Sequence, residues 1–135
     1  MIWEQLNEGA ELSPWLTPPI TADWLYDYAK ISGDFNPIHL DPQAANDAGF
    51  EGVIVHGMLN MAMMMKVVTP WLDARTMVKK FQTRFHSPLK VGESLHVSGR
   101  VVNKALEDHT ITIRLEGRNQ QGDLIVVGMV ILEVT

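Results

Sequence analysis

The stretch HGMLNMAMMMKVV, residues 56–68, decides the fold. Its apolar residues lie nearly all around a helix drawn through them, a pattern typical of a buried helix. We predict a helix that begins near His56 and Gly57 and ends before Pro70. The run is too short for a membrane span, and Asn60 and Lys66 interrupt it. Its methionines are predicted to fill the core, because flexible thioethers suit irregular gaps.

Downstream of this helix the hydrophobic period changes to two. Apolar and polar residues alternate over residues 76–88, 92–105 and 109–119, and residues 124–135 form a long apolar strand after the turn NQQGD. Four strands joined by short turns indicate an antiparallel sheet. Helices followed by strands define the α+β class. We therefore predict one domain over residues 1–135, in which an antiparallel sheet wraps around a long central helix.

Upstream of the central helix the chain contains two shorter helical patterns. Residues 1–20 are predicted to be irregular or partly extended. A helix is expected between Thr21, which suits an N-cap, and Gly33, which suits a C-terminal stop. A second short helix is predicted from Asp41 as cap and Pro42 as first helical residue to the glycine at position 49.

The composition excludes several functional classes. The chain has 135 residues, no cysteine and a net charge of −5, which exclude disulfide chemistry and argue against nucleic acid as a partner. The acidic N-terminus lacks the pattern of a secretory signal, so we expect a cytoplasmic protein without membrane association. Residues 66–104 carry a net charge of +6. That segment is either a solvated sheet face or an attractor for a phosphorylated or acidic partner.

The stretch SGDFNPIHLDP, residues 32–42, gathers titratable groups in a predicted loop. A structural interpretation explains Asp41 as a helix cap but leaves His39 unexplained. Metal binding is a second interpretation, with Asp34, His39, Asp41 and His56 as the available ligands, but the pattern matches no calcium loop or zinc helix. A third interpretation, nucleophilic hydrolysis by Ser32, lacks the Gly-x-Ser-x-Gly elbow. We predict no metal and no cofactor.

General acid–base chemistry is the fourth interpretation. Asp34 and His39 on one stiff loop can share proton transfers if both face one cavity, and Asn36 can orient a water molecule. Gly57, at the start of the buried helix, offers an unpaired backbone N–H at the positive end of the helix dipole. Such an N–H can polarise a carbonyl oxygen and stabilise an enolate. These four residues are the predicted site.

A resemblance to a known family rests on the stretch YAKISGDFNPIHLDPQAANDAGFEGVIVHGML, residues 28–59. It is similar to MaoC-like (R)-specific enoyl-thioester hydratases and 3-hydroxyacyl-thioester dehydratases of the hot-dog fold. The flanking stretches ELSPWLTPPIT, residues 11–21, and TRFHSPLKVGESLHVSGRVV, residues 83–102, also resemble the family. The family's fold is a long helix wrapped by an antiparallel sheet.

The resemblance implies a hydro-lyase that acts on acyl-CoA or acyl-carrier-protein thioesters. Asp34 and His39 would activate water and deliver a proton to C2, Asn36 would position them or the water, and the Gly57 N–H would hold the thioester oxygen. A homodimer or higher homo-oligomer is implied. Several relatives have a serine further along the central helix, whereas this helix has none. Two alternatives stay open: a non-catalytic acyl-thioester-binding subunit and a hot-dog thioesterase.

Overall fold

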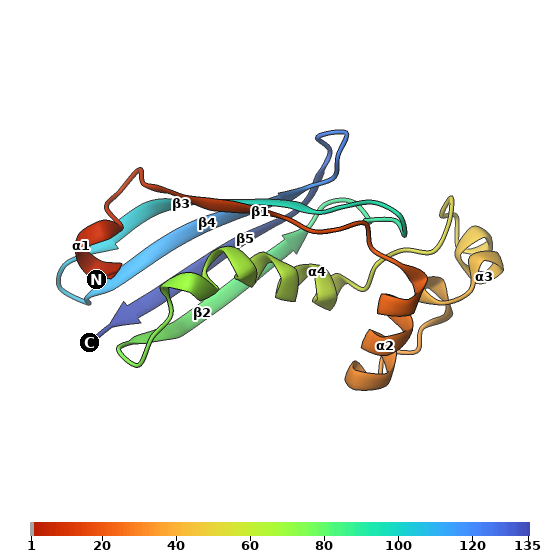
Figure 1. Ribbon diagram of the computed structural model, residues 1–135, viewed down its shortest axis with the longest axis horizontal. Helices are drawn as coiled ribbons and strands as arrows, with labels where there is room; N and C mark the ends of the chain where they lie inside the picture. The colour runs from red at the N-terminus through yellow and green to blue at the C-terminus, as the bar shows by residue number, and fades with distance from the viewer. Residues whose placement is uncertain (1) are drawn as a thin grey trace.

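The computed structural model describes residues 2–135, and Met1, the first residue of the predicted domain, lies outside the described residues. A five-stranded antiparallel sheet has the strand order β1-β3-β4-β5-β2. Its strands are β1 (Glu11–Leu16), β2 (Thr76–Phe85), β3 (His96–Ala105), β4 (Thr110–Arg118) and β5 (Leu124–Val134). Helix α4 (Gly57–Met64) lies against one face of this sheet (Figure 1). The predicted α+β fold, with a sheet around a central helix, is confirmed.

The remaining helices flank this framework. Helix α1 (Ile2–Gln5) lies at one end of the sheet, and α2 (Ala22–Ser32) and α3 (Pro42–Asp47) lie at the other end, where α4 begins (Figure 1). A 3₁₀ turn, η1 (Pro37–His39), connects α2 to α3. The predicted caps are present: the Thr21 hydroxyl accepts from the Trp24 N–H, and the Asp41 carboxylate accepts from the Gln43 N–H. Gly33 ends α2 in the left-handed conformation, with φ of 78°.

The central helix differs from the prediction in two respects. Its α-helical part ends at Met64 and continues as two 3₁₀ turns, η2 (Met65–Val67) and η3 (Thr69–Trp71). It is also not buried on all sides, because the Met58 side chain is 60% exposed. The buried face packs closely on the sheet: a β-carbon on Gly128 would lie 3.2 Å from Cε of Met64. Glycine in the sheet therefore makes room for the helix.

The segment that was predicted to be irregular or partly extended contains an edge strand. Strand β1 pairs with β3, and its register shifts between Leu12 and Trp15. Pro14 falls inside that interval, and proline is tolerated at an edge strand or a bulge because it has no N–H to donate. The sheet thus has five strands where the alternation of residues indicated four.

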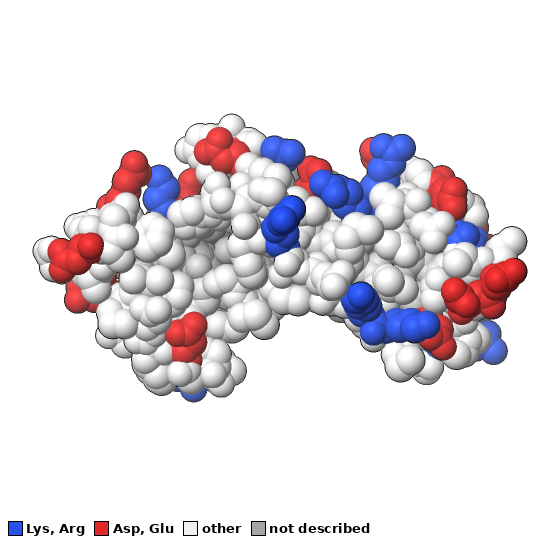
Figure 2. Space-filling model, turned by 180° about the vertical axis from the view of Figure 1, so that it is seen from behind, with Lys and Arg blue, Asp and Glu red and all other residues white. Residues whose placement is uncertain are grey.

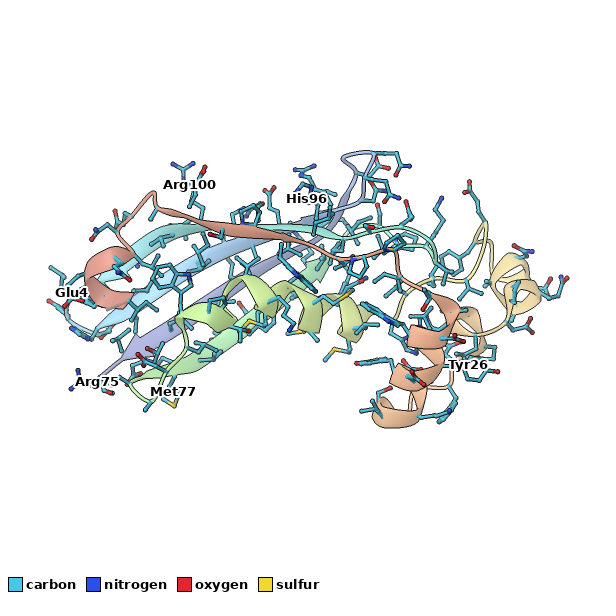
Figure 3. The ribbon with its side chains drawn as sticks, in the orientation of Figure 1. Glu4, Tyr26, Arg75, Met77, His96 and Arg100 are labelled. Atoms are coloured by element: carbon cyan, nitrogen blue, oxygen red, sulfur yellow. The ribbon has the colours of Figure 1, made fainter. Side chains whose placement is uncertain are left out.

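The hydrophobic core lies between the sheet and the central helical segment. It includes Met64 and Val68 from that segment and Val97, Ile113 and Val130 from the sheet, all with no solvent exposure. The opposite face of the sheet carries polar side chains such as His96 and Arg100, which point away from α4 in Figure 3. The core occupies one face of the sheet only. The polar residues at the start of α4 therefore lie at the end of the core and not in its middle.

Candidate active site

The loop between α2 and α3 is held by hydrogen bonds among its own polar residues. Ser32 Oγ accepts from the Asp34 N–H at 3.2 Å, and Asp34 Oδ1 accepts from the Asn36 N–H at 3.1 Å. Asn36 Oδ1 accepts in turn from the Ile38 N–H at 3.3 Å. Short polar side chains satisfy the backbone of a turn in this way. The polarity of the loop therefore has a structural reason. These hydrogen bonds give the chain a defined course from the end of α2 to His39.

The His39 side chain is 8% exposed and has a defined tautomer. Its Nδ1 lies 2.8 Å from the carbonyl oxygen of Ile54. A carbonyl oxygen only accepts hydrogen bonds, so Nδ1 carries the proton of the neutral ring and donates it to that oxygen. The second nitrogen, Nε2, is therefore left with a lone pair that can accept a proton. This is the state that a general base requires.

His56 packs directly on His39. Their ring centroids are 4.0 Å apart, with an angle of 24° between the ring planes. The His56 side chain is 1% exposed, and its Nε2 lies 3.1 Å from the backbone oxygen of Asp34. Burial of the ring is the main cause that lowers the pKa of His56 from 6.5, and the charge of His39 acts in the same direction. A hydrogen bond to the Asp34 backbone and the Asp34 charge oppose this shift.

Asp34 joins the two histidines at the edge of the site. One carboxylate oxygen of Asp34 and one ring nitrogen each of His39 and His56 lie within 4.8 Å of one another, and the Asp34 side chain is exposed. Such a group can in principle hold a cation. The spacing is wide for one zinc ion, whose tetrahedral ligands are separated by roughly 3.5 Å. It is suitable for a small molecule such as water between a carboxylate and an imidazole.

Gly57 begins α4, so its N–H has no acceptor within the helix. The positive end of the helix dipole lies at the same place. Gly57 and His39 line one cavity of about 300 Å³, together with Asn60, Phe85 and other residues. The Phe85 ring closes one side of it, because a β-carbon on Gly57 would lie 3.3 Å from Cζ of Phe85. A ligand in this cavity can thus contact the imidazole and approach the backbone amide.

The structure brings three of the four predicted site residues together, and the fourth, Asn36, has a different role. Asp34 and His39 converge, and His39 and Gly57 share a cavity. Asn36 instead uses its side-chain oxygen for its own loop, which leaves the amide nitrogen as the group that could contact water. The chemistry that the residues could perform together is an addition or removal of water beside a polarised carbonyl group.

Sequence reasoning missed two polar residues of the site. His56 was considered as the start of the central helix and as a possible metal ligand, and Asn60 only as an interruption of an apolar run. Both are buried, with exposed fractions of 1% and 3%. Asn60 Oδ1 and His56 Nδ1 have no hydrogen-bond partner among the described residues. The available signal was Asn60, a polar residue in an otherwise apolar helix. A buried polar group without a partner calls for an explanation, and a functional site is one.

The basic segment, residues 66–104, does not form a single positive surface. Lys79 pairs with Glu133 at 3.5 Å and Lys90 with Glu51 at 2.9 Å, so acidic residues from outside the segment balance part of it. On the face shown in Figure 2, basic side chains over the middle of the molecule have acidic side chains among and beside them. These observations favour the interpretation as a solvated, ion-paired face.

The comparisons with known proteins identify the family of the chain. A family model described as "MaoC like domain" matches residues 6–120, so the chain belongs to that family. The (R)-specific enoyl-CoA hydratase of Aeromonas caviae is 30% identical over 108 residues, which are 79% of this chain and 81% of that protein. The structure of an (R)-hydratase from A. caviae superposes with a TM-score of 0.85 at 25% identity, over 98% of this chain and 99% of that one.

A mitochondrial 3-hydroxyacyl-[acyl-carrier-protein] dehydratase of Arabidopsis thaliana is 37% identical over 68 residues. The match covers 50% of this chain but only 40% of that relative, so the chain spans less than half of the relative's length. These relatives are hydro-lyases by name, which is the enzyme class predicted from the sequence. The predicted family is confirmed. Among residues 2–135 no helix is long and apolar enough to cross a membrane.

Proposed function

We propose that the protein is an (R)-specific hydratase/dehydratase that interconverts trans-2-enoyl and (3R)-hydroxyacyl thioesters. The observation that carries this proposal is the convergence of the Asp34 carboxylate and the His39 imidazole, beside a cavity whose wall includes Gly57. The names of the relatives support the reaction type and the thioester class. The proposed substrates include both CoA thioesters and acyl-carrier-protein thioesters.

In the hydration direction, the oxygen of water forms a bond to C3 of the enoyl group. One proton of that water passes to the Asp34/His39 pair, and the pair delivers one proton to C2, so the catalyst is unchanged after the cycle. The electrons of the double bond move toward the thioester oxygen in the transition state. The Gly57 N–H donates to that oxygen, where the helix dipole also favours negative charge. Dehydration follows the same steps in reverse.

The roles within the pair follow from the hydrogen bonds. His39 Nε2 carries the free lone pair, because Nδ1 donates to Ile54. It is therefore the nitrogen that would accept a proton from water. Asp34 would hold the same water with its carboxylate, and Asn36 would maintain the course of the loop that presents Asp34. Each such proton transfer typically contributes about 10²–10⁴-fold to a rate.

Pairing with a second chain belongs to the proposal as well. Large exposed apolar side chains lie directly beside the site: Phe35 follows Asp34, Met58 follows Gly57, and Phe85 contacts the Gly57 position. Their exposed fractions are 57%, 60% and 51%. Strand β2 is an edge strand of the sheet formed by the described residues, and an edge strand presents a row of backbone groups to which another strand can pair. A partner chain, a second copy by our proposal, would cover these residues and enclose the site.

Hydration of trans-2-butenoyl-CoA and longer homologues tests the function through loss of the conjugated enoyl absorbance. We expect wild-type protein to hydrate at least one chain length, and Asp34→Asn and His39→Gln each to lose about 10²-fold or more of the rate. Asp27→Asn on α2 and His96→Gln on the outer face of β3 make the same chemical changes away from the site and should retain the wild-type rate. Full activity of both site variants would contradict the assignment.

The same assay separates the alternatives. Release of free thiol from the enoyl thioester without formation of a hydroxyacyl thioester would identify a thioesterase. Binding of the substrate analogue without any turnover of either kind would identify a non-catalytic acyl-binding subunit. Either result would replace the proposed reaction, because wild-type hydration is then absent.

A further inference from the structure

His56 is a buried titratable residue to which the mechanism above assigns no step. It directly precedes α4, and its side chain makes no capping hydrogen bond to the helix. Instead, the ring lies between two aromatic neighbours. It stacks on His39 at 4.0 Å and meets the edge of the Tyr28 ring at 4.8 Å, with an angle of 64° between those planes. A ring held from two sides has little freedom to turn.

The hydrogen bonds of His56 define which nitrogen carries its proton. Nε2 faces the backbone oxygen of Asp34 at 3.1 Å, and that oxygen can only accept. In the neutral ring, Nε2 is therefore protonated and Nδ1 has the lone pair. No acceptor among the described residues lies within hydrogen-bonding distance of Nδ1. A second proton on Nδ1 would thus be buried, charged and without a partner.

The surroundings of the ring favour the uncharged form. The titratable groups that face it are His39, Asp34 and Tyr28. A positive charge on His56 would lie face to face with His39, which must itself accept a proton during turnover. The exposed carboxylate of Asp34 attracts such a charge only partly, and burial of the ring outweighs it in lowering the pKa of His56.

We infer that His56 is a positioning residue that, as a neutral Nε2–H imidazole, holds the backbone of Asp34 and the ring plane of His39 in their relative arrangement. The inference rests on the proposed function of these two residues. The hydrogen bond anchors the residue whose carboxylate takes part in the reaction. The stacking contact determines the plane in which the His39 Nε2 lone pair points. Misplacement of a reacting group by about 1 Å can cost 10²-fold in rate.

A purely structural role makes a different prediction. A phenylalanine in the place of His56 could pack between Tyr28 and His39 and would remove the unpartnered Nδ1 lone pair. The backbone oxygen of Asp34, an exposed residue, would exchange its donor for water, so the fold alone does not require a histidine. Glutamine could keep a donor for the Asp34 carbonyl but would lose the stacked ring. The two variants therefore separate packing from hydrogen bonding.

Kinetics of hydration and unfolding by urea are measured on wild type, His56→Phe and His56→Gln. We expect His56→Phe to be at least as stable as wild type but to lose kcat by about 10²-fold, with KM changed less than about twofold. His56→Gln should be less stable than His56→Phe and yet faster. Rates that follow the order of stabilities, or a His56→Phe enzyme with the wild-type kcat, would overturn the inference.

His109→Phe is the matched control. His109 also stacks on an aromatic ring, that of Trp3 at 3.9 Å, and also bonds to a backbone carbonyl, that of Val134. It lies in the turn between β3 and β4, at the end of the sheet near α1 and far from α2 and α3 (Figure 1). We expect this variant to keep the wild-type kcat.

Nitrogen-15 spectra of the imidazole rings test the arrangement without reference to activity. At pH 7 (about half a unit above the ordinary histidine value), His56 should be neutral with the proton on Nε2, whereas neutral His39 should carry its proton on Nδ1. A charged His56, or the opposite tautomer, would overturn the inference even if His56→Phe fails to fold. If wild-type protein lacks hydration activity, the proposed reaction fails, while these spectra still decide the arrangement.

Discussion

The Phe85 ring lies close to Gly57 in the cavity that both residues line: a β-carbon on Gly57 would lie 3.3 Å from Cζ and 3.4 Å from Cε1 of that ring. This relationship joins the first residue of α4 to the last residue of β2. Because Phe85 is 51% exposed, its ring can give way to a small intruding group. The contact therefore concerns access to the Gly57 amide more than the stability of the fold.

Gly57→Ala should lower kcat for enoyl-thioester hydration by about 10-fold to 10²-fold, because a methyl group displaces substrate from the amide that would hold its oxygen. Hydration rates at saturating substrate check this. Gly52→Ala is the control, since no heavy atom lies within 4 Å of its β-carbon and its backbone is not left-handed. The double variant Gly57→Ala/Phe85→Leu should remain slow. If it recovers the full rate, the loss came from Phe85 and not from the amide.

The free energy of unfolding should depend on pH through His56. Its pKa in the folded protein is lowered from 6.5, so below about pH 6.5 the unfolded chain binds a proton that the folded chain does not. Stability therefore falls as the pH decreases from 6.5 through the folded-state pKa, and this contribution is constant above 6.5. We expect the free energy of unfolding of His56→Phe to decrease less steeply than that of wild type as the pH falls below 6.5. Urea unfolding of both proteins from about pH 5 to about pH 8 measures the difference. Equal slopes would contradict the prediction.

Met77→Glu should disrupt the proposed pairing of two chains. Met77 lies on the edge strand β2, its side chain is 59% exposed, and it projects outward near Arg75 (Figure 3). A charge on an apolar interface is costly to desolvate. We expect a change from dimer to monomer in light scattering, together with a lower hydration rate. Leu106→Glu, at a residue that is 75% exposed in the turn between β3 and β4, should leave both unchanged. A monomeric wild-type protein with full activity would refute the pairing.

Asn60→Leu should raise stability and lower the hydration rate. The buried Oδ1 of Asn60 has no partner among the described residues, and an unpartnered buried acceptor costs about 1–3 kcal/mol. Leucine removes that cost at similar volume. Asn60 also lines the cavity shared by His39 and Gly57, so the polar group is expected to serve the reaction at the expense of stability. Urea unfolding and hydration assays check the two effects. Met63→Leu, in the same helix, should change neither by much.

Helix boundaries were predictable because their signals are local. Thr21 and Gly33 bound α2, and Asp41 caps α3, since capping depends on side-chain oxygens and backbone angles within a few residues. Strand β1 was not predictable in the same way. Its six residues include Pro14, and only pairing with β3 makes them a strand.

The sequence by itself determined the α+β class, the central helix with Gly57 at its start, and the placement of Asp34 and His39 on one short loop. These follow from hydrophobic period and local backbone preference. The tertiary structure alone decided which imidazole nitrogens carry protons and that His56 stacks on His39. Both depend on contacts between residues that are far apart in the chain: the His39 ring meets the carbonyl of Ile54, and the His56 ring meets that of Asp34. No periodic or local signal encodes such contacts, because they arise only when separate elements pack together.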